Sequence, residues 1–137
     1  MILSGASIER AVENGELGID PFVKDNLKAA SYTFTLGSKL TVNGSEQMIG
    51  AEGYTLEPNG FLLGYTQEKL SLRGKYGCFL STRGSIAQMG LSVLLGSSFA
   101  EPDTDQVVTL EIHNVSGAPI RLEVGMKLVK GVFIPVG

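Results

Sequence analysis

The sequence predicts an all-β fold of short strands in a roll or sandwich, preceded by one short helix. Glycine occurs 18 times among the 137 residues, tryptophan is absent, and only 18% of the residues are charged. This composition suits many short strands joined by tight turns better than a helical bundle. The length predicts a single domain, residues 1–137, and the 43% of hydrophobic residues can fill one core.

A short helix is expected at about residues 5–14. The apolar residues with helical spacing are Ile8, Ala11 and Val12. Ser4 and Ser7 are candidate N-caps, and Gly15 can end the helix because glycine readily adopts the left-handed conformation.

From Ala30 onward, runs of Tyr, Thr, Phe, Leu and Val are interrupted by turn residues, which is typical of β-strands. The clearest runs are Ser31 to Leu36, Phe61 to Thr66 and Tyr76 to Ser81. Ser85 to Met89 predicts one helical turn, and Leu122 to Pro135 predicts a closing hairpin or strand pair around Gly125. The sum is roughly ten short strands, spread over about residues 30–136.

The segment Val107 to Asn114 alternates between apolar and polar residues, which predicts a strand with two distinct faces. The core-facing positions are Val108, Leu110 and Ile112, and the opposite positions are Thr109, Glu111 and His113. The second face need not be exposed to solvent. A lone histidine is more often a surface or hydrogen-bonded residue than a catalyst, so His113 is assigned no role.

Charge and hydropathy exclude several classes of partner. The net charge of −3 and the pI near 5.1 argue against nucleic acid, because the eleven scattered Lys and Arg form no basic stripe. No run approaches the roughly 18 apolar residues of a spanning helix, and no signal-peptide pattern opens the chain, which predicts a cytoplasmic protein without a membrane partner. The single cysteine, Cys78, lies in an apolar run and is expected to be a small buried hydrophobe.

Three stretches match the motifs of one family in order and spacing. The first combines Met1 to Ser4 with Gly15 to Leu17 and Asp20 to Phe22, and the second is Ala30 to Gly37. The third contains Thr82-Arg-Gly-Ser-Ile-Ala-Gln-Met-Gly-Leu91, followed by Thr109-Leu-Glu-Ile-His-Asn114. In these stretches the chain resembles the dCTP deaminase and dUTPase superfamily, and the dCTP deaminase branch fits best. The resemblance implies a distorted, jelly-roll-like β-roll that assembles as a homotrimer, with nucleotide sites at the subunit interfaces.

The resemblance also implies roles for individual residues. Glu111 occupies the position of the glutamate that acts in the deaminases as general base on water, without zinc. Arg83, Gly84 and Ser85 occupy the phosphate-binding segment, and Gln88 occupies the position of an arginine that helps to orient the attacking water. The alternatives are a strand glutamate paired with lysine or solvent, and a turn whose arginine pairs with an acidic neighbour. The zinc mechanism of other deaminases is excluded, because the chain has one His and one Cys.

Several positions depart from the family pattern. Gly84 replaces a serine, Gln88 replaces the second arginine, and Thr33 replaces the aspartate of a Ser-Tyr-Asp motif. Glu101 replaces the aspartate that activates water in the dUTPases, and the extra carbon can misplace a base by about 1 Å, which is costly in catalysis. The resemblance ends with Val132 to Pro135, so no carboxy-terminal arm is expected to close over a nucleotide.

These departures favour a catalytically inactive trimeric scaffold with a structural or binding role, such as a decoration or cement protein on a symmetric viral capsid. The alternative is an active dCTP deaminase, or a dUTPase, of nucleotide metabolism, with Glu111 as base and magnesium entering only with the triphosphate. A third interpretation is a nucleotide sensor that binds without turnover. No metal bound by the protein itself is expected, because Glu101 to Asp105 lacks the pattern of a calcium loop. In the structural role, the location would be the virion rather than the cytoplasm.

Overall fold

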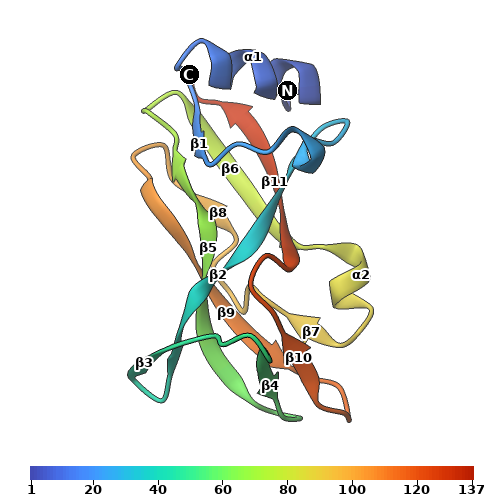
Figure 1. Cartoon of the computed structure of the whole chain (residues 1–137). Helices are drawn as coiled ribbons and strands as arrows, with labels where there is room; N and C mark the ends of the chain where they lie inside the picture. Colours follow the sequence, from blue (N-terminus) through green and yellow to red (C-terminus); the bar gives the residue numbers. More distant parts are fainter.

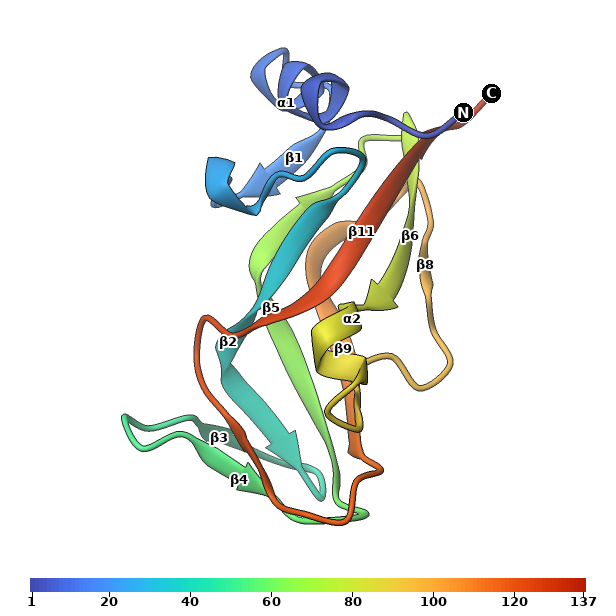
Figure 2. The ribbon, with the colours of Figure 1, turned by 90° about the vertical axis from the view of Figure 1, so that its right-hand side faces the viewer.

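The computed structural model describes all residues, 1–137, and shows a strongly curled antiparallel sheet with a helix across one end (Figure 1). The elements are α1 (Gly5–Glu13), β1 (Gly18–Asp20), the 3-10 helix η1 (Lys24–Asn26), β2 (Tyr32–Val42), β3 (Ser45–Met48), β4 (Tyr54–Leu56), β5 (Phe61–Ser71), β6 (Tyr76–Thr82), α2 (Gly84–Ala87), β7 (Leu91–Ser92), β8 (Phe99–Ala100), β9 (Asp105–Asn114), β10 (Ile120–Leu122) and β11 (Lys127–Pro135). Nine strands form the main sheet, in the order β7-β9-β5-β2-β11-β6-β8, with β1 added to β5 and β3 added to β2. β4 and β10 form a separate two-stranded sheet at the end opposite α1, where Figure 1 labels both strands and Figure 2 shows β4 from another side. This architecture confirms the predicted all-β roll with one short amino-terminal helix.

α1 is capped by the residues that flank it. Ser4 Oγ accepts a hydrogen bond from the Ser7 N–H at 3.1 Å, which satisfies one of the free donors of the first turn. Gly15 follows the helix with a φ of 75°, the left-handed conformation that ends many helices. Ile8 and Ala11 are buried and hold α1 across the end of the roll where both chain termini lie (Figure 1). None of the helices has the length and apolar character that crossing a membrane requires.

The core fills the inside of the roll with 26 buried hydrophobic residues. Tyr32 and Phe34 on β2 are among the largest, and their rings meet edge to face with centroids 5.3 Å apart. Cys78 is fully buried in the same core, as predicted, and burial raises the pKa of its thiol to about 12. A thiol with this pKa stays protonated and unreactive at neutral pH.

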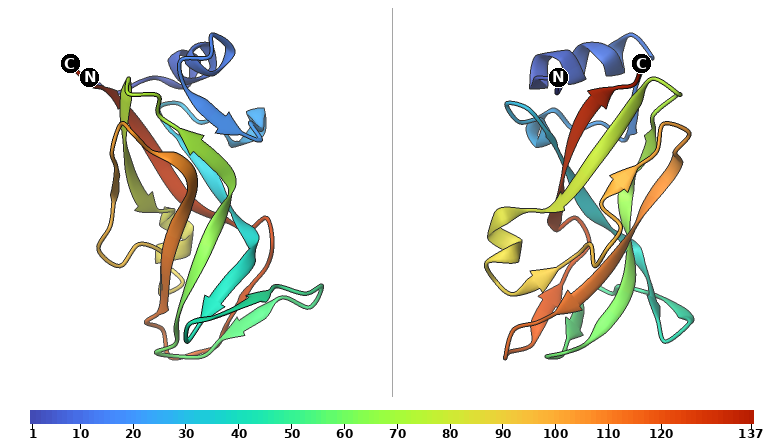
Figure 3. Two further views of the ribbon diagram at one scale, coloured as in Figure 1. Left: turned by 90° about the vertical axis from the view of Figure 1, so that its left-hand side faces the viewer. Right: turned by 180° about the vertical axis from the view of Figure 1, so that it is seen from behind.

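β9 runs antiparallel along β5, orange beside green in Figure 3, and the register pairs Leu63 with Glu111. Farther along, a β-bulge interrupts the ladder between the two strands. There Thr66 Oγ1 accepts a hydrogen bond from the Val108 N–H at 2.9 Å and donates one to the Glu68 carbonyl oxygen at 2.7 Å. The Thr66 hydroxyl thereby replaces missing ladder bonds and keeps β9 attached to β5.

The carboxy-terminal segment differs from the expected hairpin. Ile120 pairs with Leu56, so β10 belongs with β4, whereas β11 pairs with β2 and β6 of the main sheet. Gly125 does lie in a turn, with a φ of 86°, but this turn carries the chain from one sheet to the other. The prediction of a strand pair around Gly125 is therefore wrong, because a local turn signal does not determine which distant strand each flank joins.

Candidate functional site

The main sheet does not close completely, and its open seam lies between β8 and β9. β8 pairs only with β6, and β9 pairs with β7 only through His113 and Asn114. The outer edge of β9 before these two residues has no neighbouring strand. A cavity of about 300 Å³, here called the seam cavity, is lined by residues of β6, β8 and β9 and of the loops around them.

Glu111 points from β9 into the seam cavity. Its neighbours Leu110 and Ile112 are fully buried in the core, so the alternation of the strand directs Glu111 to the opposite face. The side chain is half-buried, and Oε1 accepts a hydrogen bond from the Leu95 N–H at 3.2 Å. Oε2 accepts no hydrogen bond from the protein, so this atom is free to bind a water molecule.

The seam cavity is acidic within one chain. Glu101 and Asp103 line it together with Glu111, and no lysine or arginine does so. Leu80 and Val108 contribute apolar surface. This arrangement suits a neutral heterocyclic ring that contacts apolar side chains and a carboxylate, whereas a phosphate chain would need cations from elsewhere.

The phosphate-binding residues that the family motif implies lie at the start of α2 and directly before it, outside the seam cavity. α2 begins directly after Arg83. Gly84, Ser85 and Gln88 are exposed, and none of the four residues lines the seam cavity. Within one chain, the structure does not bring the candidate base and the candidate phosphate-binding residues together.

Other positions considered in the sequence lie in different environments. Thr33 is 4% exposed, pairs with Lys130 of β11 and lies outside the seam cavity. His113 is half-buried opposite Ser92 of β7 and also lies outside it. No group of three or more His, Cys, Asp or Glu side chains is arranged to hold a metal ion.

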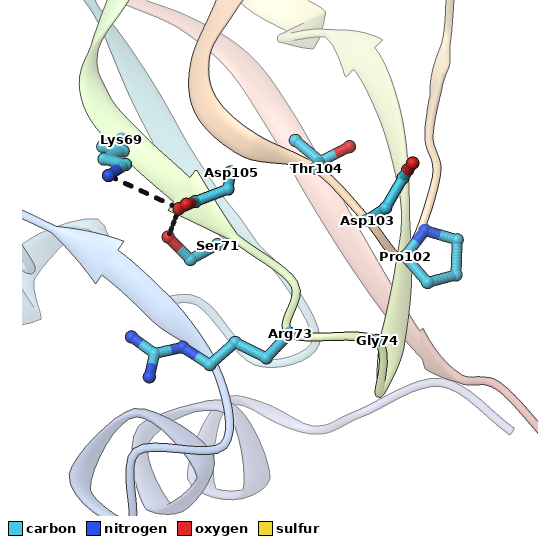
Figure 4. A pocket seen from close by; sticks show the side chains of 8 residues that line it. All are labelled: Lys69, Ser71, Arg73, Gly74, Pro102, Asp103, Thr104 and Asp105. Carbon is cyan, nitrogen blue, oxygen red and sulfur yellow. Dashed lines mark hydrogen bonds and ion pairs between the residues drawn. The ribbon is translucent and has the colours of Figure 1, made fainter.

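A second cavity, of about 440 Å³ and here called the back cavity, is lined by the end of β5, the turn that follows it and the segment Pro102 to Asp105 (Figure 4). Asp103 and Thr104 line this back cavity as well as the seam cavity. On its wall, Asp105 Oδ1 accepts a hydrogen bond from Ser71 Oγ at 2.6 Å and lies 3.4 Å from Lys69 Nζ. The hydrogen bond from Ser71, assisted by the charge of Lys69, lowers the pKa of Asp105. No local sequence pattern predicts this cluster.

Comparison with known proteins places the chain in a family. The model of the family described as dCTP deaminase-like matches residues 2–136. The protein belongs to the dCTP deaminase-like family. The dUMP-forming dCTP deaminase of Aquifex aeolicus is 30% identical to it, over 97% of this chain and 81% of the relative. The dUMP-forming dCTP deaminase of Corynebacterium glutamicum is also 30% identical, over 93% of this chain and 77% of the relative.

Solved structures agree on the fold of this dCTP deaminase-like chain. The 2′-deoxycytidine 5′-triphosphate deaminase from Agrobacterium tumefaciens matches with a TM-score of 0.81 and 18% identity over 99% of this chain. The match spans 48% of that longer chain, or about half of its length. A dUTPase from Streptococcus mutans matches with a TM-score of 0.60 and 18% identity, over 86% of this chain and 91% of its own. The predicted family and fold class are confirmed.

The comparisons also bear on the functional expectations. The curated relatives are named as dCTP deaminases, and nothing among them supports an inactive scaffold or a viral decoration protein. That expectation rested on the substitutions at Gly84 and Gln88, together with Thr33 and Glu101. The relatives favour the alternative interpretation, in which the chain acts in nucleotide metabolism.

Proposed function

We propose that the chain deaminates dCTP, with Glu111 as the general base. The observation that carries this proposal is the position of the Glu111 carboxylate, half-buried in the seam cavity with Oε2 free of hydrogen bonds from the protein. A carboxylate that lies beside apolar side chains and still reaches water is suited to accept a proton. Membership in the dCTP deaminase-like family over residues 2–136 supports the same reaction.

In this reaction, Glu111 removes a proton from water as the water oxygen forms a bond to C4 of the cytosine ring. Glu111 passes this proton to N3, and the tetrahedral C4 then carries the new hydroxyl group and the original amino group. Next Glu111 transfers the hydroxyl proton to the amino nitrogen. The bond between C4 and this nitrogen breaks, ammonia leaves, the carbonyl group of dUTP remains, and the carboxylate is unchanged at the end.

The triphosphate requires residues from outside the seam cavity, because the cavity is lined by three carboxylates and no cation. Arg83 and Ser85 occupy the phosphate-binding positions of the family motif, and Ser85 is exposed for contact with another copy. We therefore include a homotrimer in the proposal, with α2 of one copy beside the seam cavity of the next. Magnesium would arrive as part of the Mg–triphosphate substrate.

A second activity, release of diphosphate to form dUMP, is favoured by the presence of Glu101 in the same cavity as Glu111. A second carboxylate can activate a second water molecule, directed at phosphorus rather than at the ring. Product analysis separates the two activities. Deamination alone gives dUTP and ammonia, whereas the combined reaction gives dUMP, diphosphate and ammonia.

Incubation with dCTP and magnesium tests the proposal, with ammonia and uridine nucleotides as readouts. Glu111→Gln keeps the size of the side chain but cannot accept the proton, so kcat should fall at least about 100-fold. Glu57→Gln changes an exposed glutamate outside the seam cavity and should leave kcat unchanged. A folded protein that acts on neither dCTP nor dUTP would contradict the proposal. Thermal stabilisation by nucleotide without turnover would identify a sensor instead.

A further inference from the structure

We infer that Asp105 is a positioning residue that holds one wall of the seam cavity in place. The inference rests on the proposed function, because it concerns the same site. The wall is formed by residues 101–105, which comprise the loop from β8 to β9 and the first residue of β9, and are here called the wall loop. Glu101, Asp103 and Thr104 of the wall loop line the seam cavity, whereas Asp105 lines the back cavity.

Two residues at the end of β5, Ser71 and Lys69, hold the Asp105 side chain in place (Figure 4). Its Oδ1 atom accepts the hydrogen bond from Ser71 Oγ at 2.6 Å and lies 3.4 Å from Lys69 Nζ. Ser71 and Asp105 are direct partners in the register of β5 and β9, so two short side chains can reach each other. A hydrogen bond to a carboxylate is about twice as strong as a neutral one, which distinguishes this contact from an isolated surface ion pair.

The turn between β5 and β6 holds the remainder of the wall loop through its backbone. The Gly74 N–H donates to the Pro102 carbonyl oxygen at 2.8 Å, and the Leu72 N–H donates to the Thr104 carbonyl oxygen at 3.0 Å. Asp105 adds the only side-chain attachment between the wall loop and this turn region. The wall loop therefore takes its position from the turn between β5 and β6.

The wall loop takes part in both cavities. Asp103 and Thr104 line the seam cavity as well as the back cavity. A displacement of the loop would change the distance between Glu101 and Glu111, and errors of about 1 Å are costly in catalysis.

Repulsion between neighbouring carboxylates explains why the wall loop needs this attachment. Glu101, Asp103 and Asp105 place three carboxylates within five consecutive residues, and their repulsion favours a displaced loop. Lys69 and Ser71 direct the third carboxylate into the back cavity and offset its charge. The seam cavity consequently contains three carboxylates instead of four.

Amide hydrogen exchange, measured without nucleotide, tests the attachment itself. Asp105→Ala should accelerate exchange at the Leu72 and Gly74 amides, which bond to the wall loop, by about fivefold. Glu46→Ala is the matched control, because it removes a comparable exposed ion pair, with Lys39 at 3.5 Å. This control should leave both amides unchanged.

Steady-state kinetics with dCTP then tests the positioning role. Asp105→Ala should lower kcat/KM about fivefold, while the melting temperature changes by no more than about 4 °C. Asp105→Asn should recover part of the loss, because its amide oxygen still accepts the hydrogen bond from Ser71. Glu46→Ala should match the wild-type protein.

The outcomes are separable. Unchanged exchange in Asp105→Ala would overturn the attachment, and faster exchange with unchanged kcat/KM would overturn the positioning role. If the wild-type protein did not turn over dCTP, the proposed function would fail. The exchange experiment would still test the attachment of the wall loop, because it needs no nucleotide.

Discussion

Glu111 is the one carboxylate of the seam cavity that stands on a regular strand, whereas Glu101 and Asp103 stand on the wall loop. Its neighbours Leu110 and Ile112 are fully buried, so the backbone of β9 cannot turn Glu111 away from the cavity without exposing core residues. A general base must keep its direction while substrate binds and leaves. The rigid position of Glu111 therefore makes it the better candidate for the base.

Among single residues, two substitutions on and beside α2 should raise the activity toward dCTP. A Cβ atom at Gly84 would have no atom within 4 Å, and Gln88 is exposed, so Gly84→Ser with Gln88→Arg restores the family's residues without strain. The added groups can make charge-assisted hydrogen bonds, and kcat/KM for dCTP should rise about tenfold. Met89→Arg adds the same charge one position later, at a side chain that is 46% exposed, and should not reproduce the gain. An equal gain in Met89→Arg would show that the motif itself is unimportant.

At the scale of elements, the bulge between β5 and β9 depends on one hydroxyl group. Thr66 is buried, and Thr66→Val keeps its shape but leaves the Val108 N–H without its partner. The free energy of unfolding should fall by about 1–3 kcal/mol, as measured by urea denaturation. Thr41→Val removes a half-buried hydroxyl bonded only to the Tyr65 hydroxyl, at 2.8 Å, and should cost less. Equal losses in the two variants would mean that the bulge has no special dependence on Thr66.

Elements also differ in how far the local sequence determines them. The alternation of Val107 to Asn114 was sufficient to predict β9 and the direction of Glu111, because both follow from a period of two residues. The turn at Gly125 was predicted as well, but the partners of its flanking strands were not, because pairing depends on distant segments. For the same reason the contact between Ser71 and Asp105, 34 residues apart, was not predicted. The seam cavity is equally inaccessible to sequence reasoning, since it exists only where the curled sheet fails to close.

For the assembled protein, a site shared between copies predicts that a mixture of two inactive variants regains activity. Under the proposed function, Glu111→Gln lacks the base and Arg83→Ala lacks the phosphate contact, so each variant alone should be inactive. In homotrimers refolded from equal amounts of both, roughly a quarter of the interfaces combine an intact Glu111 with an intact Arg83. Activity should return to about a quarter of the wild-type value. Mixed trimers without any recovery, or a monomeric mass in solution, would argue against a site shared between copies.

Cys78 is the only thiol of the protein, and it lies fully buried in the sheet between Ala100 of β8 and Phe133 of β11. Because Cys78 is fully buried and its pKa is raised to about 12, an alkylating reagent at neutral pH can modify it only in molecules whose strands have separated. The rate of alkylation at this one sulfur atom therefore reports how often β6 comes apart from its neighbours, without any probe having to be introduced.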